Sequence, residues 1–166
     1  TPIPSSGTTF FGWSAESISD YNSLRAGGLD KPNIWRDFEG TSFSDTNIWQ
    51  ANVTTCISFK PDISQPVSTW SSNLENYLRT KPAALECYVA VWHEPEDNLS
   101  DSVMGSYSNW QRALNEVTRI CRKLAAEGRK TYSCPIFMDY TLNPSSGRDI
   151  SDWLPTGGVD YDIVGF

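Results

Sequence analysis

The residues best suited to chemistry follow directly after the most apolar stretch of the chain. Residues 87–92 carry no charge, and His93, Glu94, Pro95, Glu96 and Asp97 come immediately afterwards. A carboxyl group delivered by a buried strand can act as a general acid or base where an apolar neighbour favours its protonated form, and Trp92 lies two positions before Glu94. The ring of Pro95 is expected to keep Glu94 extended. Glu94 is therefore the candidate general acid/base.

The neighbouring histidine leaves two roles open. His93 is the only histidine of the chain, and strand alternation points it away from Glu94. A hydrogen-bonding or core role is favoured over a direct part in proton transfer. The alternative for the whole segment 94–97 is an acidic loop in solvent. One histidine and buried cysteines do not make a zinc site, so no metal and no cofactor are expected.

The elements that must position these residues alternate between strand and helix. Helical spacing of apolar residues is found in 66–79 and from Ser100 or Asp101 to the stop at Gly128, with shorter helical pieces near 19–25, 48–50 and 149–154. The expected strands are 8–13, 32–38, 54–59, 87–92, 131–138 and 161–166. Repeated βα units of this kind predict an α/β fold with a parallel sheet.

The pattern favours a (β/α)8 TIM-barrel type over an open doubly wound sheet. No glycine-rich phosphate loop follows the first strand, and titratable residues end the second to fifth strands instead of gathering at one crossover. A complete barrel needs eight strands and about 250 residues, so the chain is expected to supply an incomplete barrel of about six βα units. Residues 1–7 are predicted to be a linker or processed N-terminus, and 8–166 the partial barrel domain.

Several residues at the predicted strand ends are candidates for binding substrate. Parallel strands bring their carboxyl ends to one rim, where a few polar groups can hold a hydroxylated ligand. Aromatic faces near the same rim, those of Trp13, Trp35 and Trp92, can stack on sugar rings, with core packing as the alternative for each. The polar candidates are Asp37 and Glu39 after the second strand, Lys60 after the third, and Asp139 and Tyr140 after the fifth.

Composition excludes several classes of partner. The 166 residues are 39% hydrophobic, as in a globular domain. Twenty acidic against thirteen basic residues give a net charge of −7 with no basic cluster, which disfavours nucleic acid. No stretch approaches the roughly 20 apolar residues of a membrane span. The four cysteines are expected to be free, buried thiols.

The motif at the end of the fourth strand carries a family resemblance. Val91-Trp92-His93-Glu94-Pro95-Glu96 resembles the acid/base motif of retaining glycoside hydrolases with (β/α)8 barrels. The histidine before the glutamate is most similar to glycoside hydrolase family 26, chiefly endo-β-1,4-mannanases, as is Ser58-Phe59-Lys60-Pro61. The resemblance implies that Glu94 is the acid/base, that His93 supports it or the substrate, and that the nucleophile is a glutamate of a seventh strand beyond Phe166.

Two functional hypotheses follow. The first is an extracellular retaining glycosidase that cleaves a β-linked, mannan-like polysaccharide, with residues 1–166 inactive alone. The alternative is a non-catalytic carbohydrate-binding barrel or pseudoenzyme in a larger surface or phage-tail assembly, joined through the N-terminus. A nucleotide-binding domain is disfavoured because the phosphate loop is missing.

Overall fold

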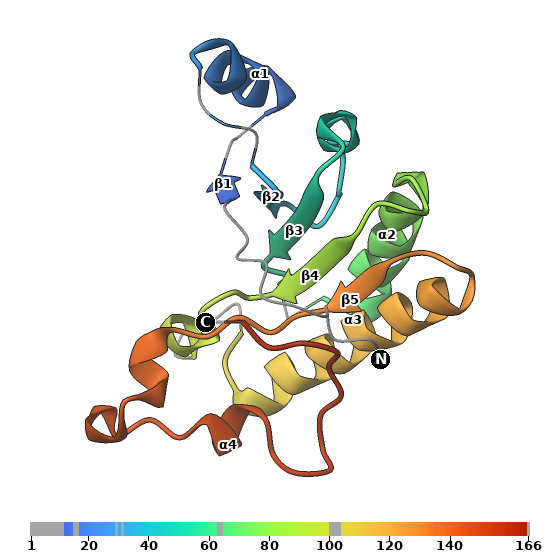
Figure 1. Cartoon of the computed structure of the whole chain (residues 1–166). Helices are drawn as coiled ribbons and strands as arrows, with labels where there is room; N and C mark the ends of the chain where they lie inside the picture. The colour runs from blue at the N-terminus through green and yellow to red at the C-terminus, as the bar shows by residue number, and fades with distance from the viewer. Residues whose placement is uncertain are drawn as a thin grey trace.

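The computed structural model has a mixed α/β architecture built on one parallel sheet (Figure 1). It describes residues 17–28, 30, 32–62, 65–99 and 104–165, and 12–14 by their backbone. The strands are β1 (Gly12–Ser14), β2 (Ile34–Glu39), β3 (Thr54–Phe59), β4 (Cys87–Val91) and β5 (Thr131–Ser133). The α-helices are α1 (Ile18–Ala26), α2 (Val67–Thr80), α3 (Tyr107–Ala126) and α4 (Ile150–Trp153). Short 3-10 helices are η1 (Asn47–Ala51), η2 (Pro95–Asn98), η3 (Asp139–Leu142) and η4 (Pro144–Ser146).

The strands lie in the sheet in their order along the chain. The order is β1-β2-β3-β4-β5, and every neighbouring pair is parallel. One row of the register runs Trp35, Thr55, Cys87 and Thr131 across β2 to β5. This arrangement confirms the predicted α/β fold and its parallel sheet.

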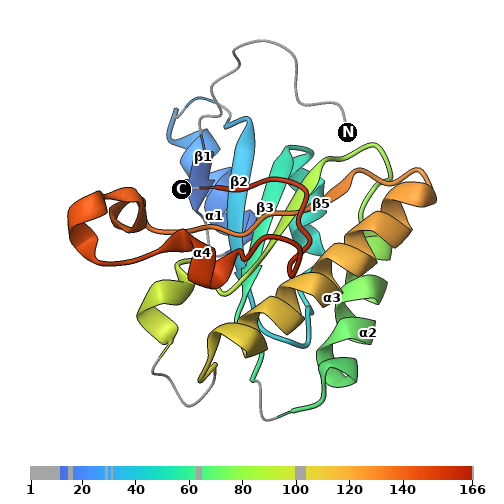
Figure 2. The ribbon, with the colours of Figure 1, turned by 90° about the horizontal axis from the view of Figure 1, so that it is seen from below.

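One face of the sheet, here called the helix face, carries the main core. All five residues of β4 are buried, and Val89 and Val91 pack in the same cluster as Trp70 of α2 and Trp110 of α3. Helices α2 and α3 lie side by side along this face (Figure 2). Burying aromatic and branched apolar side chains removes a large area from water, which is the main stabilising contribution.

The opposite face, here called the second face, carries the alternate residues of the strands. Cys56, Tyr88 and Cys134 form a separate buried cluster, with Ile34 and Tyr132 packed against it. Strand alternation explains the separation, because successive side chains point to opposite faces. The four cysteines are free and buried, as predicted.

The segment 163–165 continues the sheet beyond β5. The Gly165 N–H donates to the Pro135 carbonyl at 2.9 Å, and the Phe137 N–H donates to the Gly165 carbonyl at 3.0 Å. Ile136 and Gly165 form a parallel bridge. The segment therefore lies where the sixth strand was predicted, although its described residues form a single bridge and no regular strand.

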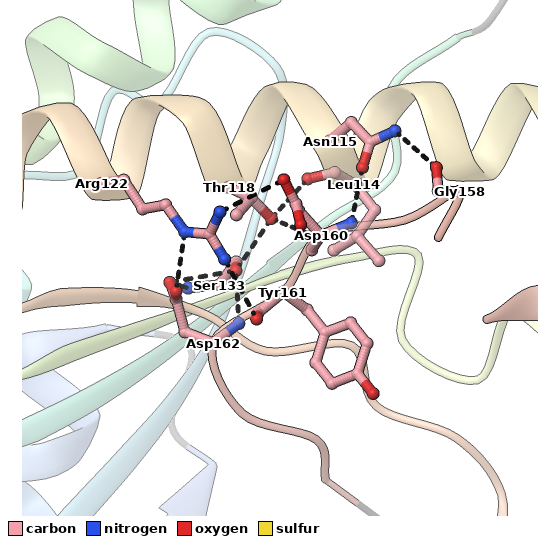
Figure 3. A network of polar contacts seen from close by, with 9 residues as sticks. All are labelled: Leu114, Asn115, Thr118, Arg122, Ser133, Gly158, Asp160, Tyr161 and Asp162. Carbon is pink, nitrogen blue, oxygen red and sulfur yellow. Dashed lines mark hydrogen bonds and ion pairs between the residues drawn. The ribbon is translucent and has the colours of Figure 1, made fainter. Parts of the chain in front are cut away.

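A polar network holds the preceding residues between α3 and β5 (Figure 3). The Thr118 hydroxyl is 2.7 Å from the Asp160 carbonyl and 2.9 Å from Ser133 Oγ. The Asp162 carboxylate accepts from the Ser133 N–H at 2.9 Å and pairs with Arg122 at 3.2 Å. These contacts fix the approach of 163–165 to the sheet.

Most predicted boundaries shift by one or two residues, and three elements need comment. The first strand was expected at 8–13, of which 8–11 lie outside the described residues, and β1 extends to Ser14. β5 ends at Ser133, because Pro135 has no N–H for a ladder hydrogen bond. α3 begins at Tyr107, where the Ser106 hydroxyl caps it by accepting from the Asn109 N–H, and not at the expected Ser100 or Asp101. Within the described residues, no helix is long and apolar enough to cross a membrane.

The network around Thr118 gives a first prediction. Replacing Thr118 with Val keeps the shape but removes the hydroxyl shared with Asp160 and Ser133. We expect the free energy of unfolding to fall by about 1–2 kcal/mol. In native-state hydrogen exchange, the amides of Ile163 and Gly165 should lose protection while those in the middle of α2 keep theirs. Unchanged protection at both amides would contradict this role.

Candidate functional site

Polar and aromatic side chains from three strands meet on the second face, near the carboxyl ends of β2, β3 and β4. Arg36 Nη2 donates to Ser58 Oγ at 3.3 Å, and the guanidinium carbon lies 5.2 Å from the centre of the Phe38 ring. The Phe38 ring meets the His93 ring edge-on, with centroids 4.9 Å apart. We call Arg36, Phe38, Ser58 and His93 the Arg36–His93 cluster.

The local sequence of β2 explains how this cluster forms. Trp35 and Asp37 are buried on the helix face, so the alternate residues Arg36 and Phe38 point to the second face. Phe38 is 55% exposed although it is large and apolar. An exposed aromatic ring held by a cation and an imidazole is a ready surface for stacking.

His93 is a neutral imidazole in this setting. Burial, together with the positive charges of Arg36 and Lys60, lowers its pKa to about 4. Its Nδ1 atom is buried and has no hydrogen-bond partner in the described part of the chain. The ring is therefore uncharged near neutral pH, and Nδ1 has an unused hydrogen-bonding position.

The chain leaves β4 through two residues in the left-handed region. Trp92 has φ 44° and Glu94 has φ 52°, which is unusual for non-glycine residues and most of all for a bulky one. The Trp92 N–H donates to the Phe59 carbonyl at 2.9 Å, and the Glu94 N–H donates to the Ile136 carbonyl at 2.7 Å. Backbone strain that neighbouring strands hold in place is typical of functional sites.

These conformations correct two expectations about the motif. Pro95 does not keep Glu94 extended, because the hydrogen bond to Ile136 and the start of η2 hold Glu94 in the left-handed region. Trp92 is only 1% exposed and packs in the main core, so its face is not offered to a ligand. The Glu94 side chain is exposed and no longer follows strand alternation relative to His93.

The loop after β5 is anchored to the loop that carries Glu94. One Glu96 carboxylate oxygen accepts from the Met138 N–H at 3.1 Å and from the Thr141 hydroxyl, and the other oxygen is buried without a described partner. These bonds place Asp139 and Tyr140, which are both exposed, next to the motif. Two of the predicted site residues are thus brought to the rim near Glu94.

A cation also supports the exposed tyrosine. Arg148 lies 5.4 Å from the centre of the Tyr140 ring and 3.6 Å from the Asp97 carboxylate. Tyr140 is 48% exposed. The rim therefore has two exposed rings, Phe38 and Tyr140, and each is contacted by an arginine.

Asp37 and Glu39 are not part of this rim, contrary to the prediction. Both lie on the helix side, where the Tyr77 hydroxyl of α2 is 3.0 Å from Glu39 Oε1 and 2.9 Å from the Asp45 carbonyl. Burial raises the pKa of Glu39 to about 7, the Tyr77 hydrogen bond opposes this, and the Asp37 charge adds to it. Burial also raises the pKa of Asp37. Strand alternation separates these acids from Arg36 and Phe38.

The remaining predicted residues are placed as follows. Lys60 is exposed just beyond β3, close enough for its charge to act on His93. Trp13 lies in β1, and its side chain is outside the described part of the structure. Sequence reasoning missed Arg36, Phe38, Glu96 and Arg148 as parts of the site. The signal for the first two was a charged and an aromatic residue at alternate positions of one strand.

The described residues contain no group of three or more His, Cys, Asp or Glu side chains arranged to hold a metal ion. Comparison of the chain with protein-family models, with curated proteins and with solved structures finds no match. The function must therefore be argued from the site itself.

The buried acids on the helix face give a prediction on pH dependence. The folded protein keeps a proton on Glu39 up to about pH 7, whereas the ordinary pKa is 4.5. Between pH 4.5 and about pH 7, Glu39 therefore binds a proton when the protein folds. The protonated Glu39 contributes its full stability below pH 4.5, and this contribution is lost as the pH rises through 7. The stability of Glu39→Gln relative to the unmodified protein should therefore be higher at about pH 8 than at about pH 5. Urea unfolding at both pH values measures the difference, and an equal difference at both would refute the assignment.

Proposed function

We propose that this protein is a glycoside hydrolase that cleaves a β-linked polysaccharide with retention, using Glu94 as general acid/base. The observation that carries the proposal is the exposed Glu94 carboxyl directly after the fourth of five consecutive parallel strands. Enzymes built on parallel α/β sheets place their chemistry at this end of the strands. The resemblance of residues 91–96 to family 26 supports the same role.

The sheet is proposed to be the first part of a (β/α)8 barrel whose interior is the second face. Two features support this over a doubly wound sheet. The strand order follows the sequence without the reversal that creates a switch point. Residues of α1, α2 and α3 (Tyr21, Trp70 and Trp110 among them) all pack in the cluster of the helix face. Right-handed crossovers in one direction place successive helices on one side, as in a barrel.

The proposed mechanism needs a second carboxylate. Retention uses an acid/base and a nucleophile about 5 to 5.5 Å apart. Asp37 and Glu39 face the helices, so they do not serve. The resemblance to family 26 would assign the nucleophile to a glutamate at the end of a seventh strand. Glu94 would protonate the leaving oxygen and then activate water, while the neutral His93 orients a sugar hydroxyl from within the Arg36–His93 cluster.

The substrate is proposed to lie across the rim between the two exposed rings. Phe38 and Tyr140 can stack on the C–H faces of sugar rings, and Asp139 and Lys60 offer hydrogen bonds at the same edge. A mannan-like backbone fits this description. The compartment proposed is extracellular, where polysaccharide is met.

A second candidate function is carbohydrate binding without hydrolysis. The observation that favours it is the burial of Trp92 in the core, which leaves the exposed Glu94 without the apolar wall expected for a proton donor. Attachment to a larger surface or phage-tail assembly through the N-terminus belongs to this alternative.

The acid/base role is tested with Glu94→Gln in the full-length protein. We expect hydrolysis of β-mannan to fall by roughly 10²- to 10⁴-fold, because the leaving oxygen loses its proton donor. For an aryl glycoside whose leaving group needs no proton, the rate of the first step, cleavage of the glycosidic bond, should fall far less. Sugar release is measured as reducing ends, and affinity by calorimetry.

Glu116→Gln on α3, where Glu116 pairs with Arg119, is the matched control, since it makes the same change of charge away from the rim. Binding of β-mannan by the unmutated protein without any release of sugar would support the non-catalytic alternative. Equal loss of activity in both variants would argue against a specific role for Glu94.

A further inference from the structure

We propose that the Arg36–His93 cluster, together with Lys60, binds the carboxylate of an acidic sugar, so that the preferred polysaccharide contains uronic acid. This inference rests on the proposed function, because it specifies the substrate class of the same rim. The proposed acidic polysaccharide differs from a neutral mannan in one chemical feature, the group on the C5 carbon of the sugar ring.

The first reason is an uncompensated positive charge. Among the described residues, neither Arg36 nor Lys60 forms an ion pair, whereas Arg79, Arg122 and Arg148 each contact a carboxylate. Within the described part of the chain, the Arg36 guanidinium forms one hydrogen bond, the 3.3 Å contact from Nη2 to Ser58 Oγ. Two unpaired cations whose charges both act on His93, in a chain of net charge −7, indicate a place for an anion.

The second reason is unused hydrogen-bonding capacity at the same place. Arg36 Nε and His93 Nδ1 are both buried, and neither has a partner in the described part of the chain. A buried donor without a partner is costly, so such atoms are expected to meet a ligand. Both residues contact the Phe38 ring, so a ligand lying against this ring lies next to both side chains.

The third reason is the geometry of the guanidinium. The guanidinium lies over the Phe38 ring, and a guanidinium can contact a carboxylate in a bidentate manner through the N–H groups that the bond to Ser58 leaves unused. The same ring is 55% exposed, which leaves area for the face of the sugar that carries this carboxylate. A neutral hydroxymethyl group could accept one hydrogen bond, but it could not balance the two charges.

The test compares two ligands that differ at this one group. Oligosaccharides of β-1,4-linked mannuronate carry a carboxylate where β-1,4-linked mannose of equal length carries a hydroxymethyl group. We expect the full-length protein to bind the mannuronate series more tightly by roughly tenfold or more. Methyl esterification of the carboxylates, which removes the charge and keeps the size, should abolish the preference. Calorimetry measures all three affinities.

Variants assign the preference to the cluster. Arg36→Gln and Lys60→Gln should each reduce the affinity for mannuronate by roughly tenfold more than they reduce the affinity for the neutral oligosaccharide. Arg119→Gln makes the same charge change on the outer surface of α3, where Arg119 pairs with Glu116, and should leave both affinities unchanged. Lys60 is exposed, so its variant reports on binding without a risk to folding.

The outcomes separate this inference from the proposed function. Neutral mannan bound or cleaved as well as the acidic series, with no effect of Arg36→Gln on their ratio, would overturn the inference and leave the hydrolase proposal intact. Loss of the preference in Arg119→Gln as well would mean that overall charge causes it, and would also overturn the inference. Failure to bind either series would overturn both proposals.

Discussion

The alternation of side chains in a continuous parallel register is the constraint on which the rest of the structure depends. β2, β3 and β4 pair residue by residue, so a row such as Trp35, Thr55 and Cys87 faces the helices throughout. The next residues of each strand then face the other way. If one strand slipped by a single residue, its core side chains would face the site and its site side chains would face the helices. The dense aromatic packing under α2 and α3 prevents such a slip.

The same alternation sorts the charges of β2. Arg36 is on the second face with His93, while Asp37 and Glu39 are on the helix face with Tyr77. Burial disfavours the charged form of the two acids and of the histidine. The acids hold their protons more tightly, and the histidine remains neutral. The Arg36–His93 cluster therefore combines the positive charge of Arg36 with an uncharged imidazole, although the chain as a whole is acidic.

The end of β4 connects the paired strands to Glu94, the candidate acid/base. Trp92 and Glu94 take left-handed conformations, held by backbone hydrogen bonds to β3 and to Ile136. Glu96 then fastens the loop of Tyr140 to the motif. A strained exit anchored on both sides gives a fixed position to an exposed carboxyl, which general acid catalysis and specific binding both require.

The sequence by itself determined the class of fold and the place of the motif. The apolar run 87–92 and the helical spacing of 66–79 are local signals, and both elements formed where they were expected. Only the tertiary structure decided which side chains meet. Arg36 and Phe38 lie on β2, whereas His93 follows β4 more than 50 positions later in the chain. Trp92 turned inward because packing in the main core outweighed local preference. Long-range packing and hydrogen bonds are not encoded in spacing along the chain, so the partners within the site became visible only once the strands were paired.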